Sequence, residues 1–222
     1  MMSHSTIAPC SIQTSFLSSI ASESAILNEI YNPKHNIAIW QRALPSTLTA
    51  DIDKMLAAGE SIALVKSVSP EETAEYIRYK LSDYDCAAAL SEDIALIVDM
   101  FCCLFNVKAA GMRLTALDTA MCPKFHVDQI PCRLVTTFSG LATQWLESQP
   151  SEGADTAHTS ANTIAGLSEL NDTEFTVQQM QAGDVALLKG SGWEGNENRG
   201  LIHRSPALET NERRLLLTLD LL

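Results

Sequence analysis

The spacing of apolar residues changes near residue 109, and this change constrains the fold more than any other feature. Before it, apolar residues recur every three or four positions over 85–105, which is typical of a helix with one buried face. After it, short alternating runs are separated by turn residues, which is typical of β-strands. Helices followed by many short strands indicate an α+β fold. We expect a double-stranded β-helix (jelly-roll) core with the N-terminal helices packed on its outside.

Local signals place several elements. A helix is expected over 47–58, and a second one begins after Ser69, which can cap the first turn while Glu72 completes a capping box. A third helix is expected over 85–105. The expected strands are 36–42, 61–68, 110–118, 125–130, 133–140, 174–180, 184–189 and 213–221.

At 222 residues the chain has the length of one large domain. We expect one compact unit with a mainly helical layer over 1–108 and a jelly-roll, metal-binding core over 109–222. The Ser-rich residues 1–24 are expected to form a mobile tail. The polar segment 148–172 is long for a loop inside a compact domain, so it is either a functional lid or a mobile insertion.

The charge balance excludes several classes of partner. Lys and Arg number 15 and Asp and Glu number 27, which gives a net charge of −12. An acidic chain is repelled by phosphate backbones and by anionic membrane surfaces, so we expect no broad binding of nucleic acid and no membrane partner. A local site for one anion is compatible with this balance.

Targeting signals and cysteine usage point to the same compartment. The chain has no run of about 20 apolar residues of the kind that spans a bilayer, and no basic leader precedes an apolar run, so no secretion signal is expected. Its six cysteines contain no C-x-x-C pair, which argues against a zinc ribbon. Reduced thiols in a cytoplasm fit this usage best.

One triplet carries the strongest chemical signal. His126 and Asp128 are two residues apart in an extended segment, so both side chains point to the same face. Among the remaining histidines, His203 is the natural third ligand because it follows an apolar pair and leads to the last strand. Two histidines and one carboxylate leave three coordination positions open, as in non-heme Fe(II) sites. The alternative is a histidine and an aspartate that merely hydrogen-bond at a strand end.

A candidate anion clamp lies in the last expected strand. Its alternation places Arg214 and Thr218 on a mixed face and leucines on the other, and the leucine face should pack on the helices. Arg214 is therefore the candidate that binds a carboxylate, and Arg213 is the fallback. The alternative is a surface arginine paired with Glu209 or Glu212.

Other polar residues near the triplet have two interpretations. Arg133 and Thr137 share a face with Ser139 and could line the same cavity, or could lie on a solvated strand face. Cys122 and Cys132 flank the triplet, and with the two histidines they would form a tetrahedral zinc set, although buried structural thiols are the simpler interpretation.

The glycine-rich segment 190–200 does not open a helix, so it is not a nucleotide-binding loop. We interpret it as a flexible rim beside His203. Trp193 could cover the metal or could merely anchor this segment. Lys189 could aid anion binding at the end of its strand, or could be solvated.

The order of these elements resembles the C-terminal half of the Fe(II)/2-oxoglutarate-dependent dioxygenases, whose core is cupin-like. In that superfamily a Gly-Asp turn opens a strand, the distal histidine follows, and an arginine on the next strand binds 2-oxoglutarate. The resemblance covers about 115–222. It implies an oxidoreductase with Fe(II) on His126, Asp128 and His203, and with 2-oxoglutarate on Arg214.

A second resemblance is carried by three segments, C-P-x-F-H-x-D, C-R-L-V-T-T and H-R-S-P. They are similar to a bacterial family known only as a domain of unknown function. That resemblance implies a role around metal limitation, with a metallochaperone GTPase as a neighbour. It makes zinc a rival to iron.

Three hypotheses follow from these patterns. The first is an oxygenase that acts on a small molecule or on a protein side chain. The second is a non-catalytic zinc-binding protein of metal homeostasis that uses the same residues. The third is a barrel without a metal that acts through partners.

Overall fold

The computed structural model describes residues 17–148, 175–197 and 199–222. In chain order the elements are β1 (Leu17–Ala21), the 3-10 helix η1 (Ser24–Tyr31), β2 (His35–Trp40), α1 (Ser46–Ala57), β3 (Ala63–Val68), α2 (Pro70–Lys80), α3 (Ala87–Phe105), β4 (Ala110–Leu117), β5 (Cys132–Ser139), β6 (Gln144–Ser148), β7 (Phe175–Gln179), β8 (Val185–Lys189), β9 (His203–Arg204) and β10 (Arg214–Asp220). The predicted segment 148–172, apart from Ser148, and residues 1–16 of the predicted tail lie outside these ranges.

The strands form two sheets. A seven-stranded sheet has the order β1-β2-β8-β5-β10-β4-β3, and a three-stranded sheet has the order β7-β6-β9. Every neighbouring pair is antiparallel except β1 and β2, which are parallel. The predicted α+β class is therefore confirmed, with a large and mainly antiparallel sheet.

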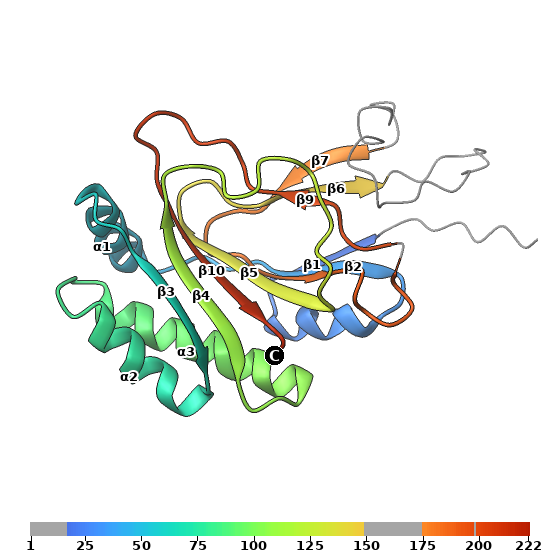
Figure 1. Ribbon diagram of the computed structural model, residues 1–222, viewed down its shortest axis with the longest axis horizontal. Coiled ribbons are helices and arrows are strands. Elements are labelled where there is room, and N and C mark those ends of the chain that lie inside the picture. Colours follow the sequence, from blue (N-terminus) through green and yellow to red (C-terminus); the bar gives the residue numbers. More distant parts are fainter. Residues whose placement is uncertain (1–16, 149–174, 198) are drawn as a thin grey trace, which may run out of the picture.

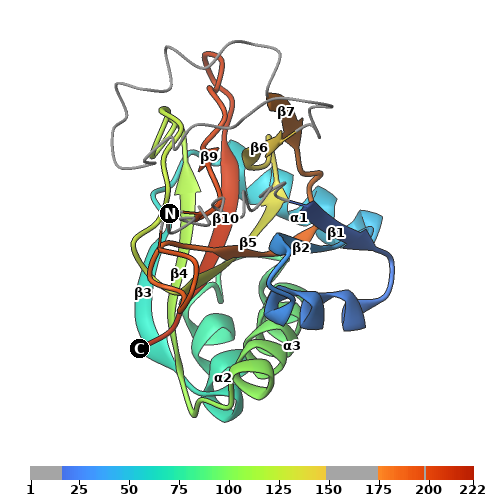
Figure 2. The same ribbon diagram turned by 90° about the vertical axis from the view of Figure 1, so that its right-hand side faces the viewer.

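The helices lie on one side of the large sheet and the small sheet lies on the other (Figures 1 and 2). One cluster of buried residues joins the helices to the large sheet and includes Ile94, Phe101 and Leu217. A second cluster joins residues of both sheets, such as Ile39, Trp145 and Leu216. The large sheet is thus covered on both faces, and its inner face, the one toward the small sheet, carries the candidate site.

Local sequence signals explain the helices. The Ser69 backbone N–H donates to the Glu72 carboxylate at 3.2 Å, and α2 begins with the predicted capping box. The apolar stripe of α3 is buried as its spacing predicts, and the helix ends at Asn106, which adopts the left-handed conformation. No helix of the described residues combines the length and the hydrophobicity needed to cross a membrane.

The alternation of β10 has the predicted consequence. Leu215, Leu217 and Leu219 are buried in the cluster beneath the helices, whereas Leu216 is buried in the cluster between the sheets. Alternate side chains of a strand point to opposite faces, so Thr218 faces the same side as Leu216. The structure therefore confirms that the mixed face of this strand is turned inward.

A bulge in β5 changes one predicted orientation. Leu215 pairs with Ser139, but Leu216 pairs with Thr137, so one residue of β5 is inserted between them. Ser139 consequently points to the helices, where its hydroxyl donates to the Asp53 carboxylate at 2.5 Å. The prediction that Ser139 shares the inner face with Thr137 was wrong, because strict alternation takes no account of a bulge.

Several elements differ from the expectation. The predicted strand 125–130 is not a strand, because its pairing is a single bridge between His126 and His203. Pro131 cannot donate a backbone hydrogen bond, which limits pairing at that end of the segment. The first half of the chain is more than a helical layer, since β1, β2 and β3 all belong to the large sheet.

Candidate metal centre

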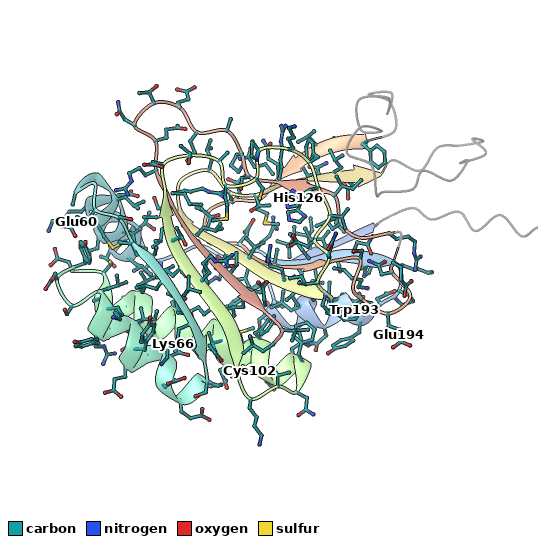
Figure 3. All side chains as sticks on the ribbon, viewed as in Figure 1. Glu60, Lys66, Cys102, His126, Trp193 and Glu194 are labelled. Atoms are coloured by element: carbon teal, nitrogen blue, oxygen red, sulfur yellow. The ribbon has the colours of Figure 1, made fainter. Side chains whose placement is uncertain are left out.

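The structure brings His126, Asp128 and His203 together. His126 lies in the connection between β4 and β5, and its backbone exchanges two hydrogen bonds with His203 in β9, at 3.0 and 2.9 Å. One possible ligand atom from each of the three side chains lies within 4.8 Å of the others. His203 is buried, while His126 and Asp128 are half-buried. This backbone pairing explains how residues far apart in sequence converge (Figure 3 labels His126).

Backbone contacts set the hydrogen position on both rings. The Nδ1 of His126 lies 3.0 Å from the Lys124 carbonyl, and the Nδ1 of His203 lies 3.1 Å from the Leu201 carbonyl. A carbonyl only accepts, so each Nδ1 carries the hydrogen and each Nε2 is left with its lone pair. The same arrangement is typical of metal-binding histidines, whose second nitrogen donates to a backbone carbonyl.

Both free lone pairs point toward the same carboxylate. The Nε2 atom of His126 lies 3.6 Å from Oδ1 of Asp128, and that of His203 lies 3.7 Å from Oδ2. These distances exceed those of hydrogen bonds. With Nδ1 protonated on each ring, three acceptor groups face one another without a hydrogen between them, and this set fits a cation.

The electrostatics follow from burial and from these neighbours. Burial lowers the pKa of His203 to about 4, so its ring is neutral near neutral pH. The contact with Asp128 raises the pKa of His126 despite partial burial. Burial raises the pKa of Asp128, but His126, His203 and Arg133 outweigh it and hold the pKa below its ordinary value. The carboxylate is therefore ionised and available as a ligand.

The glycine-rich segment packs against the backbone of the triplet. Ser191 donates its backbone N–H to the Asp128 carbonyl at 2.8 Å. A Cβ atom at Gly190 would clash with the carbonyl oxygens of Asp128 and Ile130, and one at Gly200 would clash with the Val127 side chain. The glycines are thus required for close backbone approach. The flexibility of this segment stays a prediction.

Trp193 and Lys189 lie on the far side of the large sheet from the triplet. The Trp193 ring packs on Tyr31 and Phe105, so it anchors the glycine-rich segment (Figure 3). Lys189 is buried over the Trp193 ring and donates to the Asn32 carbonyl at 3.1 Å. The structure does not place Lys189 for anion binding beside the triplet.

Arg214 is fully buried at the start of β10. Its Nη1 donates to the Leu141 carbonyl at 3.2 Å and its Nη2 donates to the Ser205 hydroxyl at 3.0 Å. Its Nε has no partner, and no carboxylate of the described residues lies within ion-pair distance. Burial lowers its pKa to about 10. The alternative of a surface arginine paired with Glu209 or Glu212 does not hold.

More polar atoms on the inner face lack partners. The hydroxyls of Thr137 and Thr218 and the indole N–H of Trp145 are buried without a hydrogen bond to the described residues. All three residues are at most 8% exposed. A buried polar atom without a partner costs about 1–3 kcal/mol, so these atoms between the two sheets indicate a place for a polar ligand or water.

The other predicted site residues lie elsewhere. Arg213 donates to the backbone carbonyls of Leu56 and Glu60 at the end of α1, so it is no alternative to Arg214. Cys132 is buried beneath the helices, where burial raises the pKa of its thiol. Cys122 is exposed, and neither cysteine belongs to the group formed by His126, Asp128 and His203.

Two contacts were missed by sequence reasoning. Arg133 makes a bidentate ion pair with Asp220 at 2.7 and 2.9 Å, and its Nη1 lies 2.9 Å from Oδ2 of Asp128. This last contact is an ion pair, because Oδ2 of Asp128 accepts no hydrogen bond from the described residues. Asp220 shares the face of Thr218, and that alternation could have indicated its position. No sequence signal predicts the contact between Ser205 and Arg214.

Comparison with known proteins places the chain in a family. Residues 21–220 match the model of the family described as "Protein of unknown function (DUF1826)", and the chain belongs to that family. No curated protein matches the sequence.

Solved structures with similar folds include three oxygenases. Dioxygenase for auxin oxidation 1 from Arabidopsis thaliana, solved with 2-oxoglutarate, has a TM-score of 0.49 at 9% identity and covers 93% of this chain and 92% of its own. A Pseudomonas putida prolyl-4-hydroxylase has a TM-score of 0.42 at 12% identity, over 88% and 96% of the two chains. An oxidoreductase of the 2OG-Fe(II) oxygenase family from Burkholderia pseudomallei has a TM-score of 0.44 at 10% identity, over 93% and 94%.

Proposed function

We propose that this protein is an Fe(II)/2-oxoglutarate-dependent dioxygenase. The observation that carries the proposal is the convergence of two imidazoles and one carboxylate, with each imidazole Nδ1 beside a backbone carbonyl and each Nε2 turned toward the carboxylate. His126, Asp128 and His203 would hold the metal. Two histidines and one carboxylate suit Fe(II) and leave open positions for other ligands.

The residues around Arg214 support a dicarboxylate as co-substrate. Its buried guanidinium lacks an acidic partner, and a guanidinium binds a carboxylate through two parallel hydrogen bonds. Ser205, which contacts Arg214, follows His203 by two residues, about 7 Å along an extended chain. The two ends of a short dicarboxylate could therefore reach the metal and the clamp together. Thr218 lies on the same face of β10 as Arg214.

Charge balance also favours a dianion. Arg133 is balanced by Asp220, and Asp128 cancels one charge of a divalent cation. The remaining charge of the cation and that of Arg214 match the two charges of 2-oxoglutarate. Site charge and ligand charge then cancel, which lowers the cost of burying both.

The chain's own residues bind and orient. The two backbone carbonyls keep each Nε2 free for the metal, and the burial of His203 limits the access of water. Bound Fe(II) would supply the activation of oxygen, coupled to oxidation of 2-oxoglutarate. The oxidised substrate is a small molecule or a protein side chain, since the net charge of −12 disfavours nucleic acid.

The fold is part of the same proposal. A cluster of buried residues packs between the inner faces of the two sheets, and strands from both halves of the chain build the large sheet. These features support a double-stranded β-helix folded as one domain. The small sheet supplies His203 and the connection between β4 and β5 supplies the triplet.

The alternative of a non-catalytic zinc-binding protein has less support. A tetrahedral zinc site would need thiolates beside the histidines, yet Cys132 is buried on the opposite face of the large sheet and Cys122 is exposed. The remaining donors are the same three residues, so the choice between the metals is left to experiment.

Anaerobic addition of Fe(II) and 2-oxoglutarate tests the proposal. We expect a weak metal-to-ligand absorption band with stoichiometric Fe(II), and succinate formation after air is admitted. His126→Ala should abolish both, whereas His35→Ala, a histidine on β2 outside the group, should abolish neither. Stoichiometric zinc in protein purified without added metal, together with no band and no succinate, would overturn the oxygenase proposal in favour of zinc binding.

A further inference from the structure

Arg133 connects the candidate metal ligand Asp128 to the last strand. It belongs to β5, and its guanidinium uses Nε and Nη2 on Asp220 at 2.7 and 2.9 Å. The third nitrogen, Nη1, is 2.9 Å from Oδ2 of Asp128. All three side chains are largely buried, with exposed fractions of 23% for Arg133, 25% for Asp220 and 13% for Asp128.

The chain of contacts fixes the direction of the Asp128 carboxylate. Asp128 lies outside any strand, and Ser191 holds its backbone by donating a backbone N–H to its carbonyl. The contact with Arg133 engages Oδ2 and turns Oδ1 toward His126. Arg133 then restrains Oδ2, and Oδ1 is free to bind a cation.

Asp220 prevents Arg133 from opposing the cation. An unbalanced guanidinium so close to a divalent cation would repel it. The bidentate pair with Asp220 cancels that charge and also holds the planar guanidinium in one orientation. Cross-strand pairing of Arg133 with Asp220 keeps both side chains on the inner face.

We propose that Arg133 is a positioning residue. Anchored on Asp220, its guanidinium holds the Asp128 carboxylate in the direction that binding of a divalent cation requires. This inference rests on the proposed function. It also gives Arg133 a role more specific than the predicted one of lining the cavity, because the guanidinium is shared between two carboxylates.

Co(II) is a suitable probe because its visible absorption reports the number and type of ligands. Its affinity and spectrum would be measured anaerobically for the wild type, Arg133→Met, Arg133→Lys and Asp220→Asn. Arg113→Met is the matched control, since Arg113 lies on the neighbouring strand β4, faces the same side as Thr218 and is exposed. Thermal unfolding of each metal-free variant would measure stability separately.

We expect Arg133→Met to weaken Co(II) binding by roughly 10–100-fold, as loss of a partner of a metal ligand does, and to change the spectrum of the bound ion. Arg133→Lys keeps the charge but not the fork, so it should recover part of the affinity. Asp220→Asn should give a smaller loss. Arg113→Met should keep the wild-type affinity and spectrum.

The outcomes separate this inference from the proposed function. If the wild type binds no Co(II), the proposed metal site itself fails. If the wild type binds and Arg133→Met binds equally well or more tightly with the same spectrum, the metal site stands and the positioning role is overturned. Arg133→Met that loses stability but keeps affinity and spectrum would likewise overturn it, because the ion pair would then be merely structural.

Discussion

At the scale of one residue, Arg214 shows how the proposed clamp can cost stability. Its guanidinium is fully buried, its Nε lacks a partner, and no described carboxylate neutralises it. Burying an incompletely paired charge is unfavourable, and proteins accept such costs at functional sites. The same features that make Arg214 a poor contributor to the folded state make it a suitable clamp.

Replacing Arg214 by methionine should therefore separate binding from stability. We expect Arg214→Met to abolish detectable 2-oxoglutarate binding, to retain Fe(II) or Co(II), and to raise the free energy of unfolding of the ligand-free protein by about 1 kcal/mol. Calorimetric titration and denaturant unfolding measure these quantities. Unchanged affinity for 2-oxoglutarate would exclude this arginine as the clamp.

His203 provides a pH-dependent prediction for the metal-free protein. Its pKa of about 4 in the folded state lies below the ordinary value of 6.5, so the unfolded chain takes up the proton first. The stability that comes from the neutral ring is complete above pH 6.5 and is lost as the pH falls toward 4, by about 3 kcal/mol.

His126 acts in the opposite direction, because its pKa is raised, so the comparison needs a variant that removes one ring only. Unfolding of the wild type and of His203→Gln between pH 7 and 4 would isolate the contribution of His203. We expect the wild type to lose more stability than the variant over this window. Parallel curves would contradict the lowered pKa.

The glycine-rich segment shows the importance of close packing between elements. Gly190 lies against the carbonyl oxygens of Asp128 and Ile130, where a larger residue has no room. None of its described residues belongs to the candidate metal group, yet the segment packs against the backbone of the triplet. Its effect on the site is therefore indirect.

Gly190→Ala should destabilise the protein by about 1–3 kcal/mol and weaken Co(II) binding at least tenfold, because the backbone of Asp128 must move. Ser69→Ala is a suitable comparison, since loss of the α2 cap costs about 1 kcal/mol far from the site and should leave Co(II) affinity unchanged. Metal titration and denaturant unfolding distinguish the two. An equal loss of affinity in both variants would mean that stability alone controls binding.

At the scale of the whole molecule, the candidate site joins parts of the chain that are far apart in the sequence. The small sheet, the connection before β5 and strand β10 all contribute to it. A cation and a dicarboxylate bound there would cross-link these parts in the native state only. Ligand binding should then be coupled to global stability.

We therefore expect Fe(II) with 2-oxoglutarate, each at about 100 times its dissociation constant, to raise the unfolding midpoint by roughly 10–20 °C under anaerobic conditions. The thermal shift should vanish in Asp128→Ala. Treatment with a metal chelator should lower the unfolding midpoint of the metal-loaded wild type and leave that of Asp128→Ala unaffected. A shift that persists in the variant would place the metal elsewhere.

Local patterns in the sequence determined the helices, most strands and the inward face of β10. Periodicity, caps and alternation are properties of neighbouring residues, so they can be read without a fold. His126 and Asp128 were accessible in the same way, because their spacing is local, and His203 was selected by its own neighbours, an apolar pair before it and the last strand after it. Their convergence was an expectation that only long-range pairing could satisfy.

The tertiary structure decided everything that depends on contacts between distant segments. The β5 bulge turned Ser139 to the helices, the single bridge between His126 and His203 replaced a predicted strand, and Cys132 was placed on the opposite face. Arg133 met Asp220 and Asp128 only when β5 and β10 paired. Such contacts depend on register and packing, and these follow from the arrangement of the whole chain rather than from any local pattern.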